Sequence, residues 1–162
     1  MDELELTAYH EAGHALVAVV VGARIVSLTI DPDRDDGPRR YGDVQLQWPA
    51  ETGAVKSLLQ SQLLVAMAGP VAEMIYLGET PHPGMVAEWA ADWREAAALA
   101  QRLVAEPGAR LAYLEAQTSK LYHRLRRDEY WAAVAAIADE LLAHEWLEDE
   151  QVRELVEYWI GS

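Results

Sequence analysis

The feature that most constrains this chain is a His-Glu-x-x-His motif at residues 10–14, which leads directly into an apolar run at residues 15–21. On a helix, residues four apart lie on one face, so His10 and His14 can reach the same metal ion. The apolar run predicts that this first helix, expected from about residue 3 to residue 21, enters the protein interior. Buried imidazoles need partners, and a metal ion supplies one.

The glutamate of the motif, Glu11, adds a catalytic group to the two histidines. A zinc ion held by such a pair lowers the pKa of water toward about 7 and polarises a carbonyl. A neighbouring carboxylate can take the proton from that water and return it to a departing amine. The motif therefore predicts Zn²⁺ as cofactor and Glu11 as the general base of a peptide-bond hydrolase. The alternative is a chance motif on an ordinary helix, and the apolar context weighs against it.

Gly13, inside the same expected helix, costs roughly 1 kcal/mol relative to alanine and needs an explanation. One explanation is the close approach of another backbone, or of a substrate, beside the metal. The other is that helix packing simply requires a small residue at this position. The sequence does not separate the two.

Composition restricts the classes of protein to which the chain can belong. Its 162 residues, 51% of them hydrophobic, suit one globular domain over residues 1–162. The absence of cysteine removes thiolate ligands, disulfides and cysteine nucleophiles. A net charge of −14 disfavours nucleic acid as a partner. The acidic N-terminus is unlike a signal peptide, and the apolar stretch at residues 15–23 is too short to span a bilayer. A soluble, cytoplasmic protein without a membrane segment is therefore expected.

Beyond the first helix, the pattern predicts two strands followed by helices. Residues 24–31 are rich in β-branched side chains and residues 43–48 alternate, so the two segments are expected to pair as a hairpin. A kink or break is expected at Gly69-Pro70, and an interruption near residues 127–128. The predicted fold class is mainly α with a small β-sheet (α+β), with the metal motif on the first helix. The later helices are expected over residues 53–77, 86–105, 109–144 and 149–159.

A catalytic zinc ion needs a third protein ligand, and the chain has no cysteine to provide it. No other histidine is suitably placed, so a carboxylate on a later helix is expected. Pattern alone does not choose among the candidates, any of which could also be a solvated surface charge. The candidates are Glu73, Glu88, Asp92 and Glu95.

Several segments resemble the peptidase domain of FtsH-type zinc proteases, peptidase family M41. Residues 8–15, Ala-Tyr-His-Glu-Ala-Gly-His-Ala, carry the most specific likeness. Residues 68–78 resemble the family's Gly-Arg-x-Ala-Glu-Glu helix, and residues 92–96 resemble the segment that supplies its acidic zinc ligand. Residues 138–147 resemble its C-terminal helices. The segments occur in the family's order and cover nearly the whole chain.

The resemblance implies a role for each matching residue. Glu11 corresponds to the catalytic base, and Glu73 to a residue that orients a histidine ligand. The edge of the small sheet, at residues 44–48, corresponds to a place where an extended substrate could bind by strand addition. The implied zinc ligands are His10, His14 and Asp92.

The sequence also departs from the family pattern. Pro70 replaces the family's arginine, and residues 86–91 replace a Ser-Thr-Gly-Ala-Ser-Asn-like run before Asp92. These 162 residues contain no Gly-x-x-x-x-Gly-Lys loop, so they are not expected to act as an ATPase. A separate ATPase partner and a homo-oligomer are compatible with the resemblance.

The predicted function is a zinc metallopeptidase that acts on peptides or unfolded protein. Because the segment before Asp92 is altered, a non-catalytic M41-like domain that binds zinc or another protein is the main alternative. A helical domain without metal is the third hypothesis.

Overall fold

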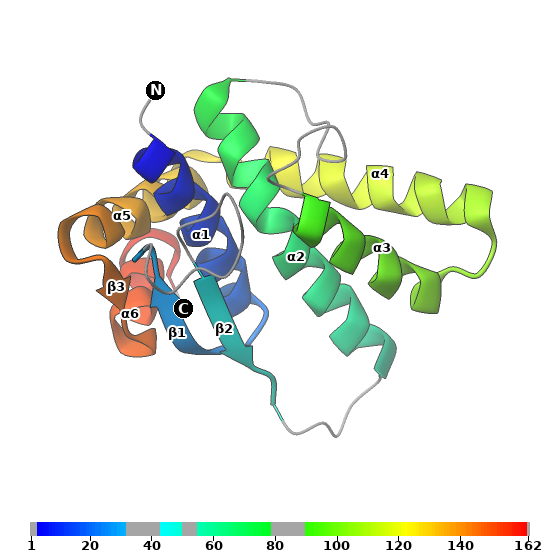
Figure 1. The fold of residues 1–162 in the computed structure, drawn as a ribbon, viewed down its shortest axis with the longest axis horizontal. Coiled ribbons are helices and arrows are strands. Elements are labelled where there is room, and N and C mark those ends of the chain that lie inside the picture. Colours follow the sequence, from blue (N-terminus) through cyan, green and yellow to red (C-terminus); the bar gives the residue numbers. More distant parts are fainter. Residues whose placement is uncertain (1–2, 32–42, 50–54, 79–89, 162) are drawn as a thin grey trace.

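The computed structural model describes residues 3–31, 43–49, 55–78 and 90–161 (Figure 1). Within these residues, helices predominate and a small sheet lies at one side, so the predicted fold class is confirmed. The helices are α1 (Glu3–Val20), α2 (Val55–Leu77), α3 (Ala90–Leu103), α4 (Pro107–Leu125), α5 (Asp128–His144) and α6 (Asp149–Ile160). The strands are β1 (Arg24–Thr29), β2 (Asp43–Gln47) and β3 (Trp146–Leu147).

Helix α1 runs through the centre of the fold, with α2 on one side and α5 on the other (Figure 1). Residues 15–18 of α1 are buried and apolar, and the helix also contacts β1, β2 and α6. This burial explains the continuous apolar run that follows the motif. The chain leaves the helix at Gly22, whose φ of 93° suits glycine.

Helix α2 crosses α1 and is apolar on nearly all sides. Among the described helices it alone is long and apolar enough to span a membrane, but 67% of its most apolar window is buried inside the protein, as in a core helix. It continues through Gly69-Pro70, so of the kink or break predicted there, the break does not occur. A proline removes only one backbone donor, and dense packing around this turn (Gly69 and Pro70 are both buried) holds the helix together.

The sheet has the strand order β2-β1-β3, and both pairings are antiparallel. The predicted hairpin of β1 and β2 is confirmed, with Ile25 opposite Leu46 and Leu28 opposite Val44. Strand β3 was not predicted. It is two residues long, too short to show a period of two, and it pairs with β1 because Glu145 adopts a left-handed conformation (φ 70°) at the end of α5.

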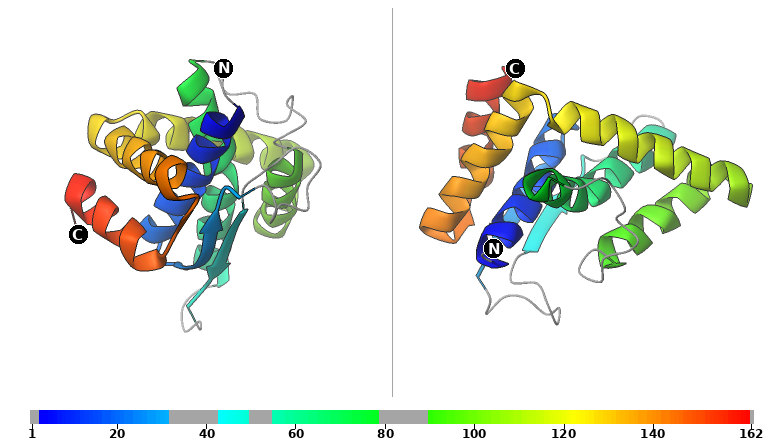
Figure 2. Two further views of the ribbon diagram at one scale, coloured as in Figure 1. Left: turned by 60° about the vertical axis from the view of Figure 1, so that its left-hand side comes forward. Right: turned by 90° about the horizontal axis from the view of Figure 1, so that it is seen from above.

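In the helical second half, α3 ends at Leu103 and not at residue 105, and its predicted start at residue 86 lies outside the described residues. Helix α4 begins at Pro107, not at residue 109, because Glu106 caps it by accepting hydrogen bonds from the backbone N–H groups of Gly108 and Ala109. The predicted interruption near residues 127–128 is confirmed between α4 and α5. Helices α3 and α4 form an antiparallel pair that extends away from α5 and α6 (Figure 2).

Candidate metal centre

Helix α1 buries four polar side chains, those of Thr7, His10, Glu11 and His14, and the last three belong to the motif. The helical repeat places the two imidazoles one turn apart, with their ring centroids 4.8 Å apart. Their Nε2 atoms are 3.1 Å apart. Two neighbouring ring nitrogens so close together, and so well shielded from water, form a pair that can coordinate a single ion.

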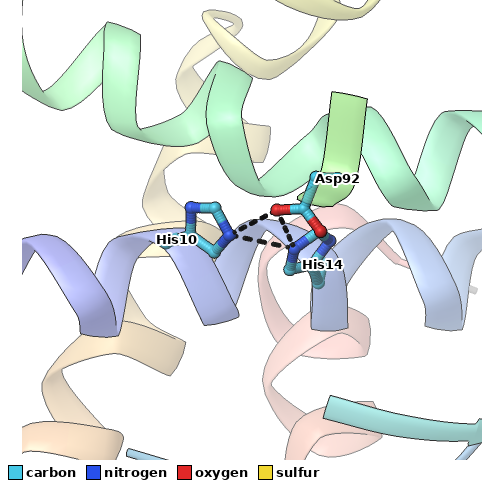
Figure 3. Close-up of side chains that lie close together, drawn as sticks. All are labelled: His10, His14 and Asp92. Carbon is cyan, nitrogen blue, oxygen red and sulfur yellow. Dashed lines mark hydrogen bonds and ion pairs between the residues drawn. The ribbon is translucent and has the colours of Figure 1, made fainter. Parts of the chain in front are cut away.

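Asp92, in the first turn of α3, reaches the same point from the other side of the site (Figure 3). One of its carboxylate oxygens, Oδ2, lies 2.8 Å from His10 Nε2 and 3.3 Å from His14 Nε2. The three potential ligand atoms all lie within 4.8 Å of one another. The Asp92 side chain keeps 24% of its surface exposed, so the cluster lies at the edge of the interior.

Helix α2 contacts the outer nitrogen of each ring. His14 Nδ1 donates a hydrogen bond of 2.6 Å to the backbone carbonyl of Val65. Glu73 Oε1 lies 3.4 Å from His10 Nδ1. Partners at Nδ1 fix the orientation and tautomer of an imidazole and leave Nε2 available to a metal. Both Nε2 atoms accordingly face each other and Asp92 (Figure 3).

Electrostatics make the metal-free site a buried ion pair. Burial by itself lowers the pKa of His14, but the charge and hydrogen bond of Asp92, helped by Glu11 and the Val65 carbonyl, raise the pKa to about 9. Burial raises the pKa of Asp92, but the charge of His14 and hydrogen bonds from both histidines outweigh it and hold that pKa well below its usual range. A metal that binds His14 Nε2 must therefore displace a proton.

The other carboxylates considered as third ligands lie elsewhere. Glu73 is buried against the outer nitrogen of His10 and is not part of the triad of ligand atoms. Glu95 is one turn beyond Asp92; burial and the negative charge of Asp92 raise its pKa, and the charge of His14 acts in the opposite direction. Glu88 lies outside the described residues. Geometry therefore selects Asp92 from the described candidates.

The donor set suits zinc. Two imidazole nitrogens and one carboxylate oxygen are common ligands of catalytic zinc, and they leave a fourth position for water or substrate. Sequence reasoning missed the Val65 carbonyl, because a backbone acceptor carries no signal in the residue type. The structure also accounts for Gly13: a Cβ atom there would lie 2.5 Å from the Ala68 carbonyl oxygen and 2.7 Å from Ala72 Cβ, so the backbone of α2 requires the glycine.

Comparison with known families matches this chain to a family model described as peptidase family M41, over residues 1–121. The chain belongs to peptidase family M41. The matched M41 region runs from α1 nearly to the end of α4 and contains every residue of the metal centre. Residues 138–147, where the sequence also suggested a likeness, lie beyond the match.

Two M41 relatives illustrate the similarity. The ATP-dependent zinc metalloprotease FtsH of Pelobacter propionicus is 33% identical over 110 residues, which are 67% of this chain. The ATP-dependent zinc metalloprotease FtsH 2 of Methylacidiphilum infernorum is 34% identical over 109 residues, which are 66% of this chain. The chain spans 16% of the length of each relative, so the similarity concerns one part of a much larger protein.

Proposed function

We propose that this M41 domain is a zinc-dependent metallopeptidase, with His10, His14 and Asp92 as ligands. The observation that carries the proposal is the convergence of two Nε2 atoms and one carboxylate oxygen, from two separate helices, within 4.8 Å. Membership of family M41 and the two FtsH relatives, named as zinc metalloproteases, give independent support.

The residues divide the chemistry among them. Zinc, when bound, supplies Lewis-acid polarisation of the scissile carbonyl and makes water more acidic. Glu11, next to the ligand His10 on α1, takes the proton from the attacking water and returns it to the departing amine. Because Glu11 is 4% exposed, its carboxylate acts in a site largely shielded from bulk water. Glu73 and the Val65 carbonyl hold the two histidines in orientation.

The substrate class follows from the sheet. Strand β2 lies at one end of the order β2-β1-β3, so among the described strands one of its edges has no partner. An extended peptide could pair with that edge at residues 44–48, and its backbone would then be the recognised feature. We therefore propose peptides or unfolded protein as substrates. An ATPase that delivers them, as the names of the relatives suggest, and a homo-oligomer belong to the same proposal.

Zinc content is the first test. The protein, purified without chelators, should hold about one zinc ion per chain, and His14→Ala should lose it. His123→Ala, which removes an exposed imidazole on α4, is the matched control and should keep the metal. Wild-type protein that takes up no zinc when the ion is supplied would exclude the proposal.

Glu11→Gln then separates the enzyme from a non-catalytic zinc-binding or protein-interaction domain. The enzyme should lose about 10²–10⁴-fold in the rate of cleavage of an unfolded protein while it keeps its zinc. Glu154→Gln, the same change at an exposed position on α6, should leave the rate unaltered. If zinc-loaded wild type cleaves nothing, or Glu11→Gln cleaves as well as wild type, the proposed mechanism is wrong.

A further inference from the structure

A second glycine, Gly69, faces the metal centre from α2. An ideal Cβ atom at this position would lie 2.3 Å from His14 Nε2 and 2.7 Å from His10 Nε2. Real Cβ atoms do not approach other atoms this closely. The atoms that it would meet are the two nitrogens that would bind zinc, not the backbone of a neighbouring helix.

The distances have a direct chemical meaning. Zinc lies about 2.0–2.1 Å from a histidine nitrogen. A methyl group on residue 69 would therefore enter the space immediately around both ligand nitrogens, where a shared ion needs room. Movement of the His14 imidazole away from that methyl group would disturb the hydrogen bond of 2.6 Å from His14 Nδ1 to the Val65 carbonyl.

The position is also costly for the helix. Glycine within a helix is unfavourable relative to alanine, and at this turn the next residue, Pro70, has no N–H to donate. Two poor helix formers therefore stand together at the turn that faces the histidines. Helix stability alone would favour alanine at residue 69, so the glycine needs a reason outside α2.

We infer that Gly69 is a positioning residue for the metal: its missing side chain leaves the two Nε2 atoms free to converge on one ion beneath α2. The inference rests on the proposed zinc site. It separates Gly69 from Gly13, where an added Cβ atom would meet the backbone carbonyl of Ala68. Gly69 thus leaves room at the proposed metal site, whereas Gly13 allows α1 to pack closely on α2.

The test compares the two glycines. Gly69→Ala should weaken zinc binding by about 10- to 100-fold or more, the loss that follows when ligand orientation is disturbed. Its far-ultraviolet circular dichroism should stay close to that of the wild type, and its melting temperature without metal should fall less than that of Gly13→Ala, because side-chain ends and not backbone must move. Gly13→Ala should lower the melting temperature of the metal-free protein, because backbone and not the end of a side chain must move. Zinc is added as its chloride, and affinity is measured by competition with a chelator.

A second set of variants covers the case in which Gly69→Ala unfolds. In a His10→Ala/His14→Ala background the imidazoles are gone, so Gly69→Ala should raise the melting temperature by its helix propensity. Gly13→Ala in that background should still lower it. The inference would be overturned if Gly69→Ala failed to raise the melting temperature in the background without imidazoles. It would also be overturned if Gly69→Ala left zinc affinity unchanged. The wild type is measured in the same experiment. If it binds zinc, a negative result for Gly69 contradicts this inference and not the proposed function.

Discussion

Helix α1 has two interfaces of opposite character. On the side of α5, the buried residues of the partner helix are all apolar, namely Ala133, Val134, Ile137, Ala138 and Leu141. On the side of α2, the same helix buries two imidazoles, which face the Val65 carbonyl and Glu73 of α2. Burial of apolar area stabilises a fold whichever apolar side chains are in contact. Buried polar and charged groups, in contrast, need specific hydrogen-bonding or charged partners.

The difference indicates where stability and chemistry reside. The α5 side requires only apolar side chains of suitable volume and shape. It can therefore hold α1 in place without determining which groups lie at the proposed metal site. On the α2 side, the ring nitrogens face defined atoms of α2 and of Asp92 on α3, so loss of one of these partners would disturb the geometry of the proposed site. The two interfaces should therefore respond to mutation in different measurements: zinc affinity on one side and unfolding free energy on the other.

The largest effect is expected from Asp92→Ala. It removes a proposed ligand and not only a residue that supports one, so zinc affinity should fall by more than the about 10–100-fold typical of residues behind the ligands. Asp128→Ala is the control, because Asp128 also lies in the first turn of a helix but is exposed on α5. Equal zinc affinity in the two variants, measured by chelator competition, would contradict the assignment of Asp92.

Ile137→Ala tests the other interface. The side chain is fully buried, so its truncation should lower the free energy of unfolding by about 2–5 kcal/mol, as measured by urea denaturation. Zinc affinity of the folded protein should not change. Tyr158→Ala, at a position 77% exposed on α6, should leave the unfolding midpoint nearly unaltered. A loss of zinc affinity in Ile137→Ala would show that the two interfaces are coupled.

Glu73→Gln should have a smaller effect on the metal than loss of a ligand. The substitution keeps the volume of the side chain but removes the charge near His10 Nδ1, and zinc affinity should fall by about 10–100-fold. Glu140→Gln is a close control, because Glu140 pairs with His144 at 3.2 Å in an exposed setting. If both variants bind zinc as the wild type does, Glu73 does not orient the ligand.

The last prediction concerns pH. In the metal-free protein the pKa of His14 is raised to about 9 from 6.5, so its pairing with Asp92 stabilises the fold fully below pH 6.5 and is lost as pH rises through 9. The depressed pKa of Asp92 contributes above its usual range and is lost only in strong acid. The melting temperature of metal-free protein should thus fall between about pH 6 and pH 9.

Zinc should reverse that trend, because its binding releases the proton of His14 and becomes tighter as pH rises. Melting curves of chelator-treated and zinc-loaded protein, recorded at matched pH, measure both trends. Asp92→Asn should flatten the metal-free profile. A wild-type metal-free profile that is already flat would argue against the His14–Asp92 pair.

Much of the fold follows from local pattern. The hairpin, the long helices and the interruption between α4 and α5 all come from periodicity and from turn residues, each within a few positions. Two of the differences from the prediction share a cause. Strand β3 exists because β1 offers it an edge, and α2 continues through Pro70 because neighbouring elements pack around it. No window along the chain contains those contacts.

The metal centre divides in the same way. By itself, the sequence determined the motif on α1, since helical spacing alone places His10 and His14 on one face. Only the tertiary structure decided which carboxylate meets them, which carbonyl holds His14, and which glycine packs against a helix rather than facing the site. The physical reason is the separation along the chain of the residues that must meet. One helical turn fixes neighbours four residues apart, whereas Asp92 joins His10 across 82 residues only when α2 and α3 pack together beside α1.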